Sequence, residues 1–142
     1  RRCWGMNREI KFRGKRLDNG EWVYGNLMRY ANGDAEIWEI FNPDIYTDCR
    51  DWVIIPETVG QYTGLKDKNG VKIFEGDILS VYDIGEQGAV EVKFDDGAFR
   101  VDDWGEKVVL DSDWIESFMA VVVNGNKWDD SSLLLGGKQD DS

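Results

Sequence analysis

Polar and apolar positions alternate along this chain in short segments that turn residues separate. Residues 8–13, 21–28 and 35–41 show this alternation, which is typical of strands that bury one face. The first two segments meet across Asp18-Asn19-Gly20, where Asn and Gly accept positive φ, so the pattern predicts a hairpin. Gly25 lies inside the second segment and indicates a bulge or a close backbone approach.

The second half of the chain repeats this pattern after Asp67-Lys68-Asn69-Gly70, the strongest turn signal in the sequence. Strands of about five residues with a turn about every 8–12 residues predict a small barrel or sandwich. We therefore expect a mainly β fold, a pseudo-barrel with an SH3-like small barrel lobe over residues 71–123 and at most one or two short helices. Pro56–Gly60 can form a single helical turn, because Pro is accepted at the first helical position.

The segment 42–52 departs from the strand pattern. It contains Pro43 and several Asp residues, which favour local backbone bonds over strand pairing, so we expect a flexible or partner-ordered loop. Gly and charged residues cluster at 60–70, where a boundary between two lobes is possible. The expected organisation is an upstream remnant, a single domain and a frayed tail, over residues 1–5, 6–135 and 136–142.

Charge is distributed unevenly along the chain. The net charge is −11, yet residues 1–30 hold eight Lys/Arg against three Asp/Glu. This basic arm can neutralise the acidic remainder, within one chain or across a dimer, or it can contact an anionic partner. The acidic remainder repels phosphate and disfavours nucleic acid. The residues that a nucleic-acid contact would use are Arg8, Lys11, Arg13, Lys15 and Arg16.

The residue types present exclude several chemistries. Histidine is absent, which removes Ser-His-Asp and Cys-His nucleophiles and His-ligated zinc. Cys3 and Cys49 form no C-x-x-C pair and make no disulfide framework. A metal-dependent hydrolase using Asp44, Glu91 and Lys93 stays an alternative, although such triplets arise by chance in so acidic a chain. We expect no enzyme activity, no catalytic residue, no metal and no cofactor.

Targeting and membrane signals are also missing from the sequence. The longest apolar run, residues 119–123, is too short to span a bilayer. Residues 1–16 are charged throughout, without the apolar core of a signal peptide. A reduced cytoplasm is the expected compartment, and no membrane partner is expected.

Four segments of the chain resemble the YopX family of phage and prophage proteins. They are MNREIKFR at 6–13, IPETVGQYTGLKD at 55–67, NG at 69–70 followed by IFEGDI at 73–78, and VNGNKWDDSSLL at 123–134. The last segment departs from the family pattern at Ser131 and Ser132, where Pro and Glu are usual. The resemblance covers residues 6–135 and implies a barrel-like, mainly β protein without established activity, encoded in phages and prophages of Gram-positive bacteria.

The family-like block around 61–77 has two interpretations. In the structural one, Asn69-Gly70 forms a positive-φ turn, Gly76-Asp77 forms a tight corner, and Tyr62 and Phe74 belong to the core. In the functional one, polar groups near one corner bind a ligand or partner. The residues of that candidate binding corner are Gln61, Tyr62, Thr63, Glu75 and Asp77.

The resemblance and the charge together predict a phage accessory protein that binds another protein. We expect a homo-oligomer in the cytoplasm of a bacterial host, contacting a basic host or phage protein through an acidic surface. The alternative is a nucleic-acid binder that uses the basic arm. In the candidate partner-binding surface, Trp104 is the apolar anchor and the charges are Asp95, Asp96, Asp102 and Asp103.

Overall fold

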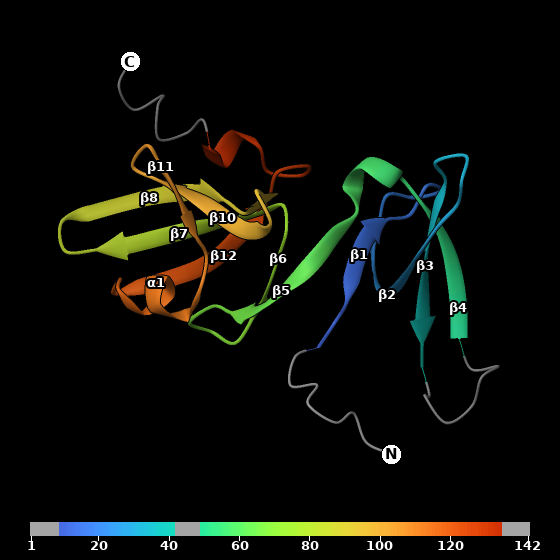
Figure 1. The fold of residues 1–142 in the computed structure, drawn as a ribbon, viewed down its shortest axis with the longest axis horizontal. Coiled ribbons are helices and arrows are strands. Elements are labelled where there is room, and N and C mark those ends of the chain that lie inside the picture. The colour runs from blue at the N-terminus through green and yellow to red at the C-terminus, as the bar shows by residue number, and fades with distance from the viewer. Residues whose placement is uncertain (1–8, 42–48, 135–142) are drawn as a thin grey trace. The chain divides into compact units, whose positions relative to one another are not determined.

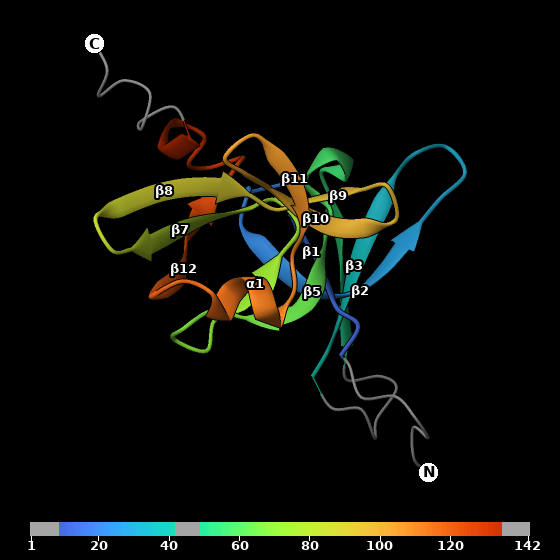
Figure 2. The same ribbon diagram turned by 60° about the vertical axis from the view of Figure 1, so that its left-hand side comes forward.

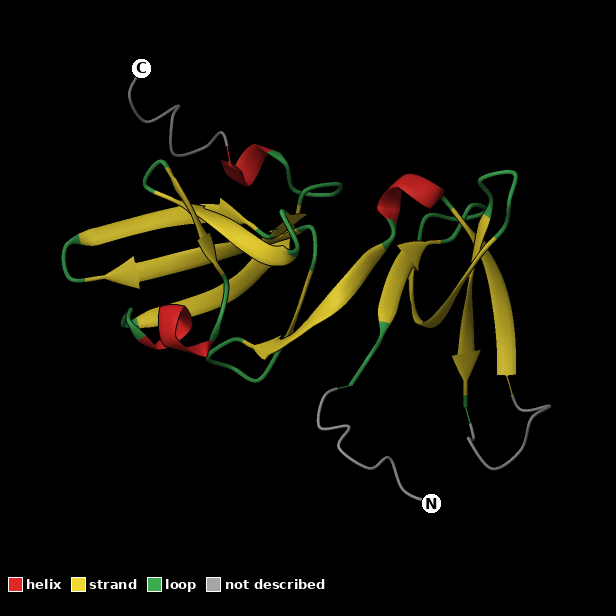
Figure 3. Ribbon diagram, in the orientation of Figure 1, coloured by secondary structure: helices red, strands yellow, loops and turns green. Residues whose placement is uncertain are grey.

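The computed structural model describes residues 9–41 and 49–134, and this part of the chain is mainly β with short helices, as predicted (Figures 1 and 3). The chain divides into two compact units, Arg1–Tyr62 and Thr63–Ser142. No helix in the described ranges has the length and apolarity needed to cross a membrane.

The first unit is built on antiparallel strands of one sheet. Its elements are β1 (Phe12–Lys15), β2 (Trp22–Arg29), β3 (Ala35–Ile40), β4 (Cys49–Ile54), the 3-10 helix η1 (Pro56–Thr58) and the start of β5 (Gly60–Lys66). The strand order is β4-β3-β2-β1-β5-β6, where β6 (Lys72–Phe74) belongs to the second unit. The Leu17 N–H donates to the Val53 carbonyl, and the Ile55 N–H donates to the Lys15 carbonyl. The end of β4 is therefore hydrogen-bonded to the end of β1.

The core of the first unit follows from the alternation seen in the sequence. Val23, Ala35, Ile37 and Ile54 are buried together. Gly25 divides β2, because the residues up to it pair with β1 and those after it pair with β3. A Cβ at Gly25 would collide with the backbone carbonyl of Trp38, which confirms the predicted close approach.

The prediction for 42–52 is wrong over residues 49–52, while residues 42–48 lie outside the described ranges. β4 pairs with β3 along its whole length, from Cys49 opposite Ile40 to Ile54 opposite Ala35. This pairing satisfies the backbone groups that the Asp side chains were expected to bind. The helical turn that follows is confirmed, with Pro56 at its first position.

The second unit contains two three-stranded antiparallel sheets, ordered β12-β7-β8 and β11-β10-β9. Its further elements are β7 (Asp77–Asp83), β8 (Glu86–Glu91), β9 (Lys93–Asp95), β10 (Ala98–Asp103), β11 (Glu106–Val109), α1 (Ser112–Glu116) and β12 (Ala120–Asn126). Figure 2 shows α1 beside β12.

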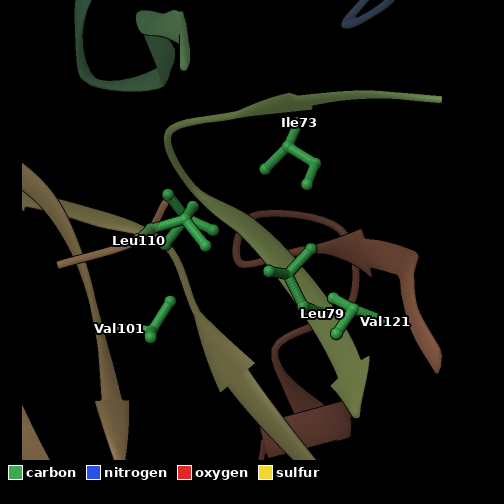
Figure 4. Close-up of a cluster of buried hydrophobic side chains, with 6 residues drawn as sticks. Ile73, Leu79, Val101, Leu110 and Val121 are labelled. Atoms are coloured by element: carbon green, nitrogen blue, oxygen red, sulfur yellow. The ribbon is translucent and has the colours of Figure 1, made fainter. Parts of the chain in front are cut away.

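The two sheets of the second unit share one core. Figure 4 shows side chains from both sheets and from β6 within it, and the buried members are Ile73, Leu79, Val92, Val101, Leu110 and Val121. Closing a barrel requires one continuous hydrogen-bonded sheet. In the described residues the two sheets stay separate, so the predicted barrel lobe is an open arrangement of two sheets.

Candidate functional site

The five residues of the candidate partner-binding surface lie in the strands and turns of the β9-β10-β11 sheet, but they do not form one cluster. Asp95 ends β9 and pairs with Ala98, the first residue of β10. Asp103 ends β10 and pairs with Glu106. The pair Asp95 and Asp96 is therefore separated from Asp102 and Asp103 by the length of β10, about 15 Å at the usual rise of a strand.

The first acidic pair belongs to the turn between β9 and β10. Asp96 (φ 50°) and Gly97 (φ 80°) are its two left-handed residues, which confirms the turn that the Asp-Asp-Gly sequence indicates. Lys107 places Nζ 3.2 Å from Asp95 Oδ2. The Nε of Arg100 donates to the Asp95 carbonyl at 2.9 Å. The charge of Asp95 is thus already matched by a cation within the sheet.

Trp104 occupies the tip of the β10–β11 hairpin. Its side chain is 74% exposed, and its φ is 54°, followed by 91° at Gly105. A left-handed backbone costs an L-residue about 1–2 kcal/mol, and a bulky side chain is uncommon there. Asp102 Oδ1 stabilises the turn by accepting the Gly105 N–H at 3.0 Å.

Asp103 faces α1. Trp114 donates its indole Nε1–H to Asp103 Oδ2 at 3.0 Å, and its own backbone N–H is capped by Asp111 Oδ1 at 2.8 Å. The Trp114 ring meets Phe118 edge to face, with centroids 4.8 Å apart. Sequence reasoning missed α1, although Asp111 is a favourable N-cap residue ahead of the apolar Trp114, Ile115 and Phe118.

These elements enclose a cavity of about 310 Å³ within the second unit, which we call the Trp104 cavity. Its walls come from β7, β8, the tip of β10, α1 and the helical turn at 131–134. The apolar lining includes Val81, Val90, Trp104, Trp114, Phe118 and Leu133, and Asp102 and Asp103 also line it. Only Trp104 and the two Asp residues were singled out from the sequence.

Among the described residues, the carboxylates of the Trp104 cavity have no matching cation. No Lys or Arg of residues 9–41 and 49–134 lines the cavity, and neither Asp102 nor Asp103 forms an ion pair within these ranges. Lys107 lies opposite Asp102 in the β10–β11 register, but its ammonium contacts Asp95. The cavity therefore offers aromatic faces and negative charge together.

The basic arm lies along β1 of the first unit. Lys15 places its ammonium 5.6 Å from the Trp22 ring centroid, and Arg13 places its guanidinium 4.6 Å from the same ring. Arg13 is also buried, at 5% exposure. Lys11 contacts a neighbouring glutamate at 3.7 Å, and Arg8 lies outside the described ranges. The described cations of the arm thus contact the chain's own aromatic and acidic groups.

Arg16 ends this arm in a two-pronged contact. Its Nε and Nη2 donate to the two carboxylate oxygens of Asp18 at 2.9 and 2.6 Å, and its guanidinium lies 3.8 Å from the Trp52 ring centroid. The hydrogen bond from Arg16 lowers the pKa of Asp18, and the same bond raises the pKa of Arg16.

The described residues contain no metal-binding cluster of the kind that the hydrolase alternative requires. No group of three or more Cys, Asp or Glu side chains there could hold a metal ion. Glu91 is 3.7 Å from Lys127, and Asp44 lies outside the described ranges.

The family model of the YopX protein matches residues 11–135. The chain belongs to the YopX family. The structure is similar to the crystal structure of protein EF1440 from Enterococcus faecalis, with a TM-score of 0.59 and 25% identity, covering 90% of this chain and 99% of that one. It is also similar to protein yopX from Bacillus subtilis, with a TM-score of 0.55 and 23% identity, covering 87% of this chain and 97% of that one. No curated protein matches the chain.

The YopX-like block provides local structural contacts. Tyr62 and Phe74 are buried, as predicted, and Asp77 is 2% exposed. Asp77 Oδ2 accepts the Phe74 N–H at 2.7 Å, and Thr63 Oγ1 donates to the Ile73 carbonyl at 2.8 Å.

The five residues of the candidate binding corner in this YopX-family chain are divided between the two units. Gln61 and Tyr62 belong to the first unit, and Thr63, Glu75 and Asp77 to the second. Gln61, Thr63 and Glu75 are half-buried. The structural interpretation accounts for the buried members, and binding at this corner stays a prediction.

Proposed function

We propose that this YopX-family chain is a non-enzymatic binding module that docks a basic protein through the tip of the β10–β11 hairpin. The observation that carries the proposal is Trp104, a 74% exposed indole beside two carboxylates that have no cation partner in the described chain. Trp is one of the three side chains enriched among residues that dominate binding energy, and the net charge of −11 favours a basic partner.

Folding stability does not account for Trp104. Most of the Trp104 side chain is exposed to solvent, and the left-handed backbone of this residue is unfavourable for a bulky side chain. Asn or Asp at this position would suit the two-residue turn better. A residue that the turn disfavours and the core does not need is expected to act at an interface.

The test is capture of partners from a bacterial host lysate by the tagged full chain and by Trp104→Asn. The substitution keeps the left-handed turn and removes the indole. The control is Ile84→Asn, which removes an 85% exposed apolar side chain from another hairpin tip of the same unit.

We expect one stoichiometric protein to bind the wild-type chain and the Ile84 variant at low salt, and to elute at about 0.5 M salt, where the screening length falls to about 4–5 Å. The Trp104→Asn variant is expected not to capture this protein. Capture that resists salt, or that survives Trp104→Asn, contradicts the proposal.

Two further expectations accompany this proposal. A homo-oligomer is tested by analytical ultracentrifugation of the full chain. The nucleic-acid alternative is tested by retention on heparin at low salt, because only a locally basic surface would hold so acidic a chain.

A further inference from the structure

We infer that the Trp104 cavity receives a lysine side chain of the basic partner, with its alkyl stem along the apolar wall and its ammonium beside the aromatic rings and the acidic edge of the cavity. This inference rests on the proposed function and names the chemistry of the contact. Its first support is the composition of the cavity. Val81, Val90 and Leu133 supply an aliphatic surface, and the rings come from the hairpin tip and α1.

The second support is charge complementarity. One oxygen of each carboxylate is engaged, Asp103 Oδ2 by the Trp114 indole and Asp102 Oδ1 by the Gly105 N–H. The other oxygen of each makes no hydrogen bond within the described ranges. Asp103 is half-buried beside apolar surface, so its carboxylate is less screened than one in water and attracts a cation more strongly. Aromatic faces within about 6 Å of the cation add to that attraction.

The arrangement of free oxygens favours lysine over arginine. An arginine guanidinium is best matched by a carboxylate that offers both oxygens to its planar fork. Here Asp102 and Asp103 each offer one. An ammonium group has three donors without a fixed fork, so a single free carboxylate oxygen is enough to accept from it. The long lysine stem also buries against apolar surface while its charge stays near water.

Cavity geometry provides a variant that blocks the site without changing its charge. Gly88 lies in β8 and lines the cavity. A Cβ at Gly88 would be in ordinary contact, 3.9 Å from the nearest ring atom of Trp104. Gly88→Val therefore extends methyl groups toward the indole from a strand position that suits a β-branched residue.

The experiment is an NMR titration of the full chain with hexalysine, hexaarginine and fully acetylated hexalysine, reading the indole N–H signals of Trp104 and Trp114. We expect saturable shifts with hexalysine, at least several-fold weaker binding of hexaarginine, and none with the acetylated peptide. Gly88→Val should abolish the indole shifts. The double variant Asp102→Asn with Asp103→Asn should bind hexalysine about ten-fold more weakly, which corresponds to about 1.4 kcal/mol.

The matched control is Asp96→Asn with Glu57→Gln, which removes two exposed carboxylates that do not line the cavity and leaves the Asp95–Lys107 pair in place; it is expected to change affinity by less than about two-fold. Equal effects of the two double variants, or hexalysine shifts that survive Gly88→Val in a folded protein, overturn the inference. Either result leaves the proposed function intact if Trp104→Asn still abolishes partner capture. If one of these results overturns the inference and Trp104→Asn also captures the partner as well as the wild-type chain does, both the inference and the proposed function are rejected.

Discussion

Substituting Gly76 with alanine tests the corner that joins the YopX-like block to the closing segment of the chain. Gly76 has φ +93°, and a Cβ there would overlap the Trp128 ring. The backbone cannot move away easily, since the Gly76 N–H donates to the Val92 carbonyl at 2.8 Å and its own carbonyl accepts the Lys127 N–H at 2.9 Å.

Two terms set the magnitude for Gly76→Ala. The left-handed backbone costs about 1–2 kcal/mol for an L-residue. Alanine also lowers the conformational entropy of the unfolded chain, which offsets about 0.4–1 kcal/mol of that cost. Displacing the indole adds about 1–3 kcal/mol, as for other overpacked sites. The expected loss of unfolding free energy is about 2–4 kcal/mol. Gly70→Ala is the matched control, because Gly70 has φ +83° and nothing within 4 Å of its Cβ position; its loss should be about 1 kcal/mol.

Urea unfolding followed by tryptophan fluorescence and circular dichroism measures both variants, and a double-mutant cycle with Trp128→Ala isolates the packing term. Without the ring, Gly76→Ala should cost only the backbone term of about 1 kcal/mol, giving a coupling energy of about 1–3 kcal/mol. Equal losses for the Gly70 and Gly76 variants, or an additive cycle, would refute the claim that Trp128 packs onto Gly76.

Three further changes test individual contacts. Arg16→Gln should return the lowered pKa of Asp18 toward 3.8 in an NMR titration; the pair stabilises the fold at neutral pH and loses that effect as pH falls through the folded pKa. Asp67→Asn should cost about 1–3 kcal/mol in urea unfolding, and Asp67→Ala more, because Oδ2 accepts the Val123 N–H. Gly25→Ala should cost more than about 3 kcal/mol, since its Cβ meets a β3 carbonyl; native-like thermal unfolding contradicts this.

Sequence reasoning succeeded where the chemistry is contained in a few neighbouring residues. Asp96-Gly97 forms a turn in which both residues take positive φ, and in the turn at Asn69-Gly70 the glycine does; both turns follow from residues that accept this conformation. Pro56 begins η1 for an equally local reason. The close approach at Gly25 could be anticipated because a glycine weakens a strand interior, so it is found there mainly at bulges and where another backbone passes close by.

The same reasoning failed where a distant partner decides the outcome. β4 begins at Cys49 because β3 supplies its hydrogen bonds, and no local signal in 49–52 announces that pairing. Arg13 was named among the cations that a nucleic-acid contact would use, yet it is buried beside Trp22, since burial depends on what packs over a strand.

The sequence by itself determined the mainly β class, the YopX resemblance, the turns and the acidic net charge, because each depends on short-range backbone preferences or on composition. The tertiary structure decided which acids matter together. It separated Asp95 and Asp96 from Asp102 and Asp103 along one strand, and it assembled the Trp104 cavity from β7, β8, the β10 tip, α1 and residues 131–134. Such a cavity depends on strand register and packing between segments tens of residues apart, which short-range patterns do not encode.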